Sequence, residues 1–155
     1  MSALTSLQIA LELATRQRDA CGRALVEERQ VCMVAQDQLE QLESYLRETR
    51  DRWALGARSS ASAEIMRHCE LFMERLQQAA GLQRGAVAQR ERELEGARQR
   101  LLAAEIRIAS LDKLLTRRRS SASSREANRV QKELDEFAAQ QHRRLHSTIQ
   151  TMGTL

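Results

Sequence analysis

The chain has 155 residues; 30% are charged, and its aromatic side chains are one Trp, one Tyr and two Phe. This is poor material for a globular core, while an apolar content of 42% set in a regular period argues against disorder. No apolar run approaches the ~20 residues that span a membrane. Acidic and arginine side chains throughout residues 1–30 exclude a secretory signal peptide, so we expect a cytoplasmic protein.

The net charge of +4 lies entirely in the last quarter of the chain. Residues 1–115 carry 17 basic and 17 acidic side chains, whereas residues 116–155 carry eight basic and four acidic ones. A basic tail can bind nucleic acid, a membrane surface or a protein. Because no aromatic platform or groove-reading motif accompanies the charge, we predict a solvated helix face or a protein docking surface, and no nucleic-acid partner.

Two apolar seams with alternating steps of three and four residues run through residues 4–115. The first is apolar at twelve of fifteen positions: Leu4, Leu7, Leu11, Ala14, Arg18, Cys21, Leu25, Glu28, Cys32, Ala35, Leu39, Leu42, Leu46, Thr49 and Trp53. The second is apolar at thirteen of fifteen: Met66, Cys69, Met73, Leu76, Ala80, Gln83, Val87, Arg90, Leu94, Ala97, Leu101, Ala104, Ile108, Leu111 and Leu115. Heptad seams of this length are typical of coiled coils.

The equal lengths of the seams favour an antiparallel pairing within one chain. Trp53 then faces Met66, Leu4 faces Leu115, and the turn is centred near residues 59–60. We therefore predict an all-α fold, a long antiparallel two-helix coiled-coil hairpin with helices at about 3–54 and 63–142. Its C-terminal helix overhangs its partner. The alternative is a parallel dimer in which each seam pairs with a copy of itself; the hairpin predicts a free monomer.

The stretch "ALGARSSASAE", residues 54–64, is the predicted tip of the hairpin. The chain has no proline, so its small residues must end the helices here. Gly56 can adopt the left-handed conformation that closes a helix. Ser60 or Ser62 can cap the second helix, and Glu64 adds an acidic side chain to its first turn.

No motif for catalysis, cofactor binding or metal binding is found. The sequence shows no phosphate-binding loop, nucleophile elbow or catalytic Cys–His motif, so we expect no enzyme activity and no cofactor. Cys21, Cys32 and Cys69 all lie on the seams without facing one another, which predicts reduced core residues. His142 and His146 have a spacing that could hold a metal, but no third ligand is near, so we predict surface histidines.

One flank of the hairpin carries apolar residues where charged residues usually screen the seam. With Leu39 labelled a in the heptad abcdefg, Tyr45, Gln38, Phe72 and Ala79 are g positions, and g faces g in an antiparallel pair. We call this surface the aromatic flank; its two stripes are Gln38, Leu42, Tyr45 and Thr49, and Phe72, Leu76, Ala79 and Gln83. It is either extra cover for the core or a groove for a partner.

The second predicted helix continues past Leu115, the position at which the first helix no longer has residues to pair with it. The serines of "RRRSSASSRE", residues 117–126, are expected to loosen the helix and shift the register. A new apolar stripe follows, made of Ala127, Val130, Leu134, Phe137 and Leu145, with no partner inside the hairpin. We expect residues 1–115 to form the paired part of a single domain. Residues 116–155 form a basic overhang, helical to about His142 when bound and frayed when free.

Three blocks in this order and spacing resemble the flagellar export protein FliJ family. They are "LEQLESYLRETRDRW" (39–53), "FMERLQQAAGLQRGAVAQRERELE" (72–95) and "VQKELDEFAAQ" (130–140), and the resemblance covers about residues 3–144. It implies a hairpin similar to the central shaft of rotary ATP synthases, in the type III secretion ATPase stalk family. The alternatives are an export chaperone for secreted flagellar proteins and a generic dimeric structural coiled coil.

The resemblance also implies partners and a location. Members bind inside the hexameric export ATPase, contact the cytoplasmic domain of the export-gate membrane protein and handle empty export chaperones, at the cytoplasmic face of the inner membrane. They do not insert into the membrane. Gate contacts would fall on Gln38, Leu42, Tyr45, Phe72, Leu76, Ala79 and Gln83. ATPase contacts would fall on Arg117, Arg118, Arg119, Arg125, Arg129, Lys132, Leu134 and Phe137.

Overall fold

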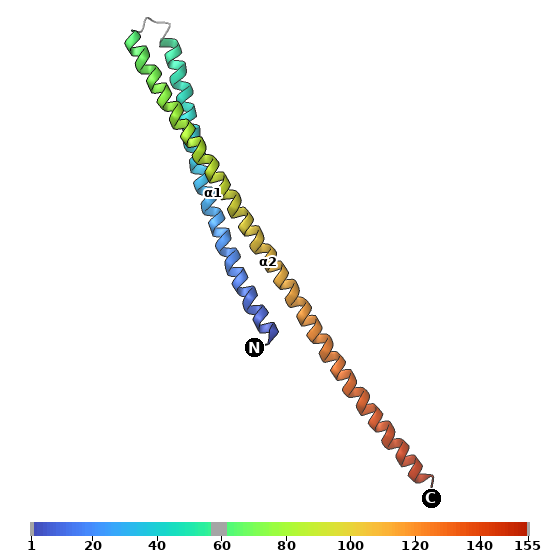
Figure 1. Ribbon diagram of the computed structural model, residues 1–155. Helices are drawn as coiled ribbons and strands as arrows, with labels where there is room; N and C mark the ends of the chain where they lie inside the picture. The colour runs from blue at the N-terminus through green and yellow to red at the C-terminus, as the bar shows by residue number, and fades with distance from the viewer. Residues whose placement is uncertain (1, 57–61, 155) are drawn as a thin grey trace. The chain divides into compact units, whose positions relative to one another are not determined.

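A computed structural model describes residues 2–56 and 62–154 (Figure 1). Two α-helices, α1 (Ala3–Gly56) and α2 (Ala63–Met152), account for its regular structure in these ranges. They pack against each other in opposite directions, which confirms the predicted all-α hairpin. The predicted start of α2 at residue 63 is confirmed, whereas its predicted end at His142 falls ten residues short of the observed Met152. The predicted turn centre at residues 59–60 lies outside the described residues.

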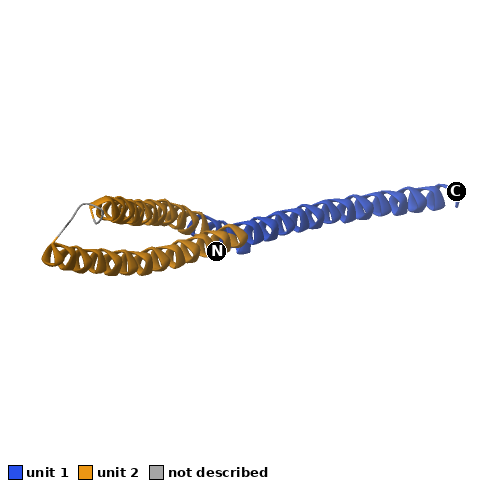
Figure 2. Cartoon of the chain, turned by 90° about the horizontal axis from the view of Figure 1, so that it is seen from above, with its two compact units in different colours: residues 1–13, 108–155 blue, residues 14–107 orange. Residues whose placement is uncertain are grey.

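The chain divides into two compact units, which Figure 2 distinguishes by colour. One comprises Ala14–Arg107 and contains most of both seams. The other comprises Met1–Leu13 with Ile108–Leu155 and contains the basic part of the chain.

In the Ala14–Arg107 unit, the core follows the predicted seams. The buried side chains there are Ala14, Leu25, Cys32, Ala35, Thr49, Ala80, Val87 and Ala97, and every one is a seam position. Interhelical hydrogen bonds give the direction of packing: the Gln83 side chain reaches Ala35 and Gln38, while Gln36 reaches Glu91, further along α2. Higher numbers on α2 therefore meet lower numbers on α1. Small side chains dominate this core, as expected where two helices alone must share a narrow seam.

Both helices begin at a serine cap. The Ser62 hydroxyl accepts a hydrogen bond from the backbone N–H of Ile65 at 3.3 Å, which confirms one of the two caps predicted for α2. Ser2 does the same for the backbone N–H of Thr5 at 3.2 Å, a cap that we had not predicted. Glu64 lies in the first turn of α2 as expected. Gly56 does not adopt a left-handed conformation, because it is still the last helical residue of α1.

In the other unit, α2 ends its packed stretch at Leu115, which is buried. A shallow hollow joins the start of α1 to α2; its lining is Ser2, Ala3, Leu4, Arg118, Ser121, Ala122 and Arg125. Every residue from 116 to 154 is exposed, although all of α2 up to Met152 is helical. The expected loosening at 117–126 is therefore wrong: each serine lowers helix propensity only slightly, and the neighbouring arginines are good helix formers.

Candidate partner-binding surfaces

Three aromatic side chains meet on the aromatic flank of the Ala14–Arg107 unit. Tyr45 of α1 and Phe72 of α2 contact edge to face, with ring centroids 6.3 Å apart and an interplanar angle of 87°. Trp53 also contacts Phe72, with ring centroids 5.6 Å apart and an interplanar angle of 57°. Tyr45 is 44% exposed and Phe72 is 40% exposed, while Trp53 is half-buried. The rings thus cover the seam and still present an apolar surface to solvent.

The other residues of the aromatic flank differ in how far they are exposed. Gln83 is held across the helices, because its side-chain amide donates to the Ala35 carbonyl at 2.9 Å and to the Gln38 side-chain oxygen at 3.3 Å. Leu42, Leu76 and Ala79 are half-buried, and Gln38 is exposed. Thr49 is buried, with its hydroxyl unpartnered among the described residues, so it belongs to the core and not to the surface.

The opposite flank of the same unit is polar and charged. Arg84 of α2 forms an ion pair with Glu43 of α1 at 3.1 Å, and the Gln36 amide donates to Glu91 at 3.3 Å. These four residues are e positions, so charged or polar side chains screen the seam there in the usual way. The two flanks of one hairpin therefore differ in chemistry at these levels: a partner segment that docked over Arg84 and Glu43 would displace an ion pair, whereas one that docked over Tyr45 and Phe72 would not.

The basic part of α2 presents its charges in the open. Arg117, Arg118, Arg119, Arg125 and Lys132 are exposed and form no ion pair with any described residue. Arg129 differs, since it pairs with Glu126 at 2.7 Å and with Glu133 at 4.0 Å on the same helix. Leu134 and Phe137 add apolar surface, at 58% and 60% exposed. This stretch can bind an acidic protein surface through the arginines and an apolar one through the two side chains.

The sequence-predicted cysteines and histidines form no site. All three thiols are free; Cys32 is buried, and Cys21 and Cys69 are half-buried. The His142 and His146 rings lie 5.5 Å apart, and the described residues contain no group of three possible metal ligands. No helix in the described ranges is long and apolar enough to cross a bilayer.

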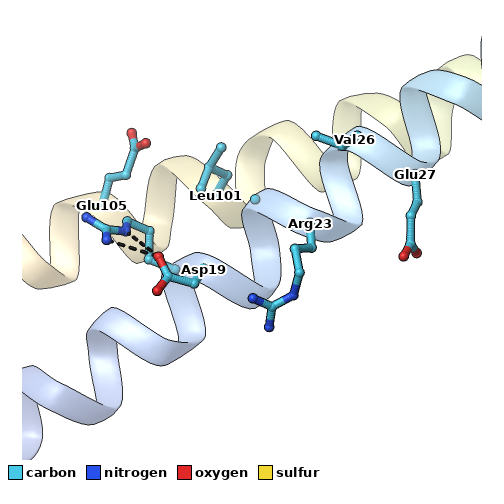
Figure 3. Close-up of a pocket in the computed structure, with 8 residues that line it drawn as sticks. Asp19, Arg23, Val26, Glu27, Leu101 and Glu105 are labelled. Atoms are coloured by element: carbon cyan, nitrogen blue, oxygen red, sulfur yellow. Dashed lines mark hydrogen bonds and ion pairs between the residues drawn. The ribbon is translucent and has the colours of Figure 1, made fainter.

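A hollow lined by residues of both helices is not a catalytic cleft either. Figure 3 shows its lining, where α1 passes α2 within the Ala14–Arg107 unit. Arg18 and Asp19 neutralise each other at 3.0 Å, and Arg23 and Glu27 extend outward from α1. Val26 and Leu101 supply the apolar part. No nucleophile with a neighbouring base is among these side chains, so the hollow offers binding surface without an arrangement for acid–base or covalent chemistry.

Two features of the site were missed in the sequence. The seam places Trp53 opposite Met66, but its large ring reaches sideways to Phe72. The Arg84–Glu43 ion pair was also missed, although opposite charges at e positions on the two helices were a usable signal.

A comparison with protein-family models finds one that spans nearly the whole chain. The model described as "Flagellar FliJ protein" matches residues 2–147. The match includes both helices, the aromatic flank and most of the exposed basic stretch. No curated protein and no solved structure is significantly similar to the chain.

Proposed function

The chain belongs to the flagellar FliJ protein family and is thus a component of the flagellar export apparatus; from this premise we propose that it acts as the stalk of the export ATPase. The chain binds inside the hexameric ATPase, promotes its assembly and turnover, and links it to the export gate. It supplies no catalytic residue. It works at the cytoplasmic face of the inner membrane at the flagellar base, where it also binds empty export chaperones.

The observation that carries the ATPase part of the proposal is the bare helix after Leu115. Every residue from 116 to 154 is exposed, and this stretch carries the whole excess of positive charge. A single helix of this length without packing is marginal in water, so it gains most from a partner that surrounds it. A ring with acidic and apolar inner surfaces meets this requirement through Arg117, Arg118, Leu134 and Phe137.

Binding inside a ring would raise ATP turnover without any chemistry by the stalk. A helix that contacts several subunits at once binds the assembled ring and not the separate subunits. Mass action then favours the ring in proportion to the stalk concentration and its affinity. If the ATPase active sites lie between subunits, the hydrolysis rate follows the fraction of subunits assembled.

The gate contact is assigned to the aromatic flank. Tyr45 and Phe72 form an exposed aromatic pair flanked by Leu42, Leu76 and Ala79, an arrangement that suits an apolar helical or extended segment of a partner. Aromatic side chains that are already held in place lose little entropy on binding, which favours their use as anchors. Because this flank lies in the Ala14–Arg107 unit and the basic stretch in the other, one chain can engage two partners through separate residues.

The proposal is tested by binding of the chain to the ATPase hexamer and to the gate's cytoplasmic domain, measured separately. Charge reversal at Arg117, Arg118 and Arg119 should weaken only ATPase binding, and the double variant Tyr45→Ala/Phe72→Ala only gate binding. The matched control for the charge reversal is Arg16→Glu/Arg75→Glu/Arg92→Glu, three exposed arginines of the other unit. If the variants affect both partners equally, or neither, the assignment is wrong.

A further inference from the structure

The last part of α2 carries an apolar stripe that is longer than the sequence analysis indicated. Val130, Leu134, Phe137 and Leu145 are continued by Ile149 and Met152, and their exposed fractions range from 44% to 76%. At 100° per residue, these six side chains lie on one side of the helix. No described residue covers them, so the stripe needs a partner in solution.

The spacing of most apolar residues in the stripe is the same from its N-terminal end as from its C-terminal end. About the peptide between residues 139 and 140, Leu134 mirrors Leu145, Val130 mirrors Ile149, and Ala127 mirrors Met152. A helix with such a pattern can pair with a second copy of itself running in the opposite direction, because these three pairs of apolar side chains then meet at the same levels, while Phe137 lies level with His142.

The charges beside the stripe follow the same symmetry. Glu133 and Arg144 lie on one flank, and Asp135 and His146 lie on the other. In an antiparallel pair each flank meets its own counterpart, so Glu133 of one copy faces Arg144 of the other, and this contact occurs twice. In a parallel pair, the flank that carries Glu133 and Arg144 would instead face the flank that carries Asp135 and His146. Arg144 makes no ion pair with any described residue, and Glu133 has only the 4.0 Å contact with Arg129.

We propose that two copies of this chain associate through residues 127–152 of α2 as an antiparallel helix pair. The association is weak. The pair is short, Gln141 and Thr148 interrupt its apolar centre, and the charge pairs are exposed and screened by salt. It is therefore populated at high protein concentration and low salt, and the hairpin is monomeric when dilute. This inference depends on the exposed tail alone and not on the proposed ATPase function.

The experiment is sedimentation of the full chain from about 1 to about 500 µM, without any partner, at low and high salt; this range covers typical weak interfaces. We expect a reversible monomer–dimer equilibrium that weakens with salt. Leu134→Glu should abolish it, because two glutamates would enter the apolar centre. Leu82→Glu is the matched control, since Leu82 is also exposed, at 79%, but lies in the other unit.

A charge-swap series tests the direction of pairing. Glu133→Arg and Arg144→Glu should each weaken dimerisation about tenfold, since each replaces two attractive contacts with two repulsive ones. The double variant Glu133→Arg/Arg144→Glu should restore it. A chain that stays monomeric throughout, a dimer that survives Leu134→Glu, or a double variant without rescue would each overturn the proposal.

Discussion

Tyr45 on α1 and Phe72 on α2 meet edge to face, with their ring centroids 6.3 Å apart, yet remain 44% and 40% exposed. Rings needed only as core would be expected to lie deeper, as the seam positions do. The opposite flank of the same unit is closed by the Arg84–Glu43 ion pair. The hairpin therefore has one side with exposed aromatic surface and one side where an interhelical ion pair screens the seam.

The double variant Tyr45→Ala/Phe72→Ala is expected to lose binding to the cytoplasmic domain of the export gate. Two aromatic anchors at the centre of an interface contribute about 2 kcal/mol each, or about 4 kcal/mol together, so the affinity should fall by roughly 1,000-fold. Calorimetry measures the affinity and circular dichroism the helical content. Leu71→Ala is the control, because Leu71 is 48% exposed on another face of α2. A collapse of helical content in the double variant would instead show that the rings are core.

Thr49→Val is expected to stabilise the hairpin. The Thr49 side chain is buried, and its hydroxyl has no hydrogen-bond partner among the described residues. Valine has nearly the same shape and removes the desolvated hydroxyl, so unfolding should cost about 1 kcal/mol more. Thermal unfolding followed by circular dichroism measures the change.

Thr116→Val is the matched control for that substitution. The Thr116 hydroxyl is exposed and donates to the Asp112 carbonyl at 2.9 Å, so its removal gives no such gain. Equal stabilisation by the two variants would mean that helix propensity, and not the buried hydroxyl, is responsible.

The rate of amide hydrogen exchange should differ between the packed residues before Leu115 and the exposed residues after it. Backbone amides between residues 14 and 49 lie in packed helix and should exchange slowly. Those of 116–152 are held by helix hydrogen bonds alone and should exchange faster by orders of magnitude. The measurement is mass-spectrometric exchange on the dilute chain. Comparable protection in both stretches would mean that the tail is covered even when the chain is alone.

The Glu95 carboxylate should titrate below its usual range. Hydrogen bonds from Gln99 at 2.9 Å and from Arg98 at 3.5 Å lower its pKa from the ordinary 4.5. A lowered folded-state pKa gives a stabilising contribution above the unfolded pKa, which disappears as the pH falls through the folded pKa. Gln99→Ala should raise the pKa of Glu95, as measured by carboxyl NMR titration. No change would mean that the Gln99 hydrogen bond is not formed in solution.

The pattern of the sequence was sufficient for the fold. An apolar period sustained over both seams predicts two helices, and equal seam lengths favour the antiparallel pairing over a parallel dimer. Every buried side chain among the described residues, from Ala14 to Leu115, was a predicted seam position. Helix ends were harder: Ser62 was one of two candidate caps, and nothing before Gly153 obliges α2 to stop.

The candidate surfaces were only partly predictable. Heptad labels placed Tyr45 against Phe72, because labels determine which flanks meet. They do not give the reach of a large ring, so Trp53 was left in the seam, and they do not separate a buried Thr49 from an exposed Gln38 within one stripe. The position of a side chain between seam and flank depends on the local path of both helices.

Measurements of ATP hydrolysis show most directly whether this chain is the stalk of the export ATPase. The cognate ATPase would be titrated with the full chain and with a version that ends at Leu115, at concentrations where the ATPase alone is poorly assembled. We predict stimulation that saturates near one chain per ATPase hexamer and is lost on truncation. Unchanged hydrolysis at every ratio, or equal stimulation by the truncated chain, would contradict it.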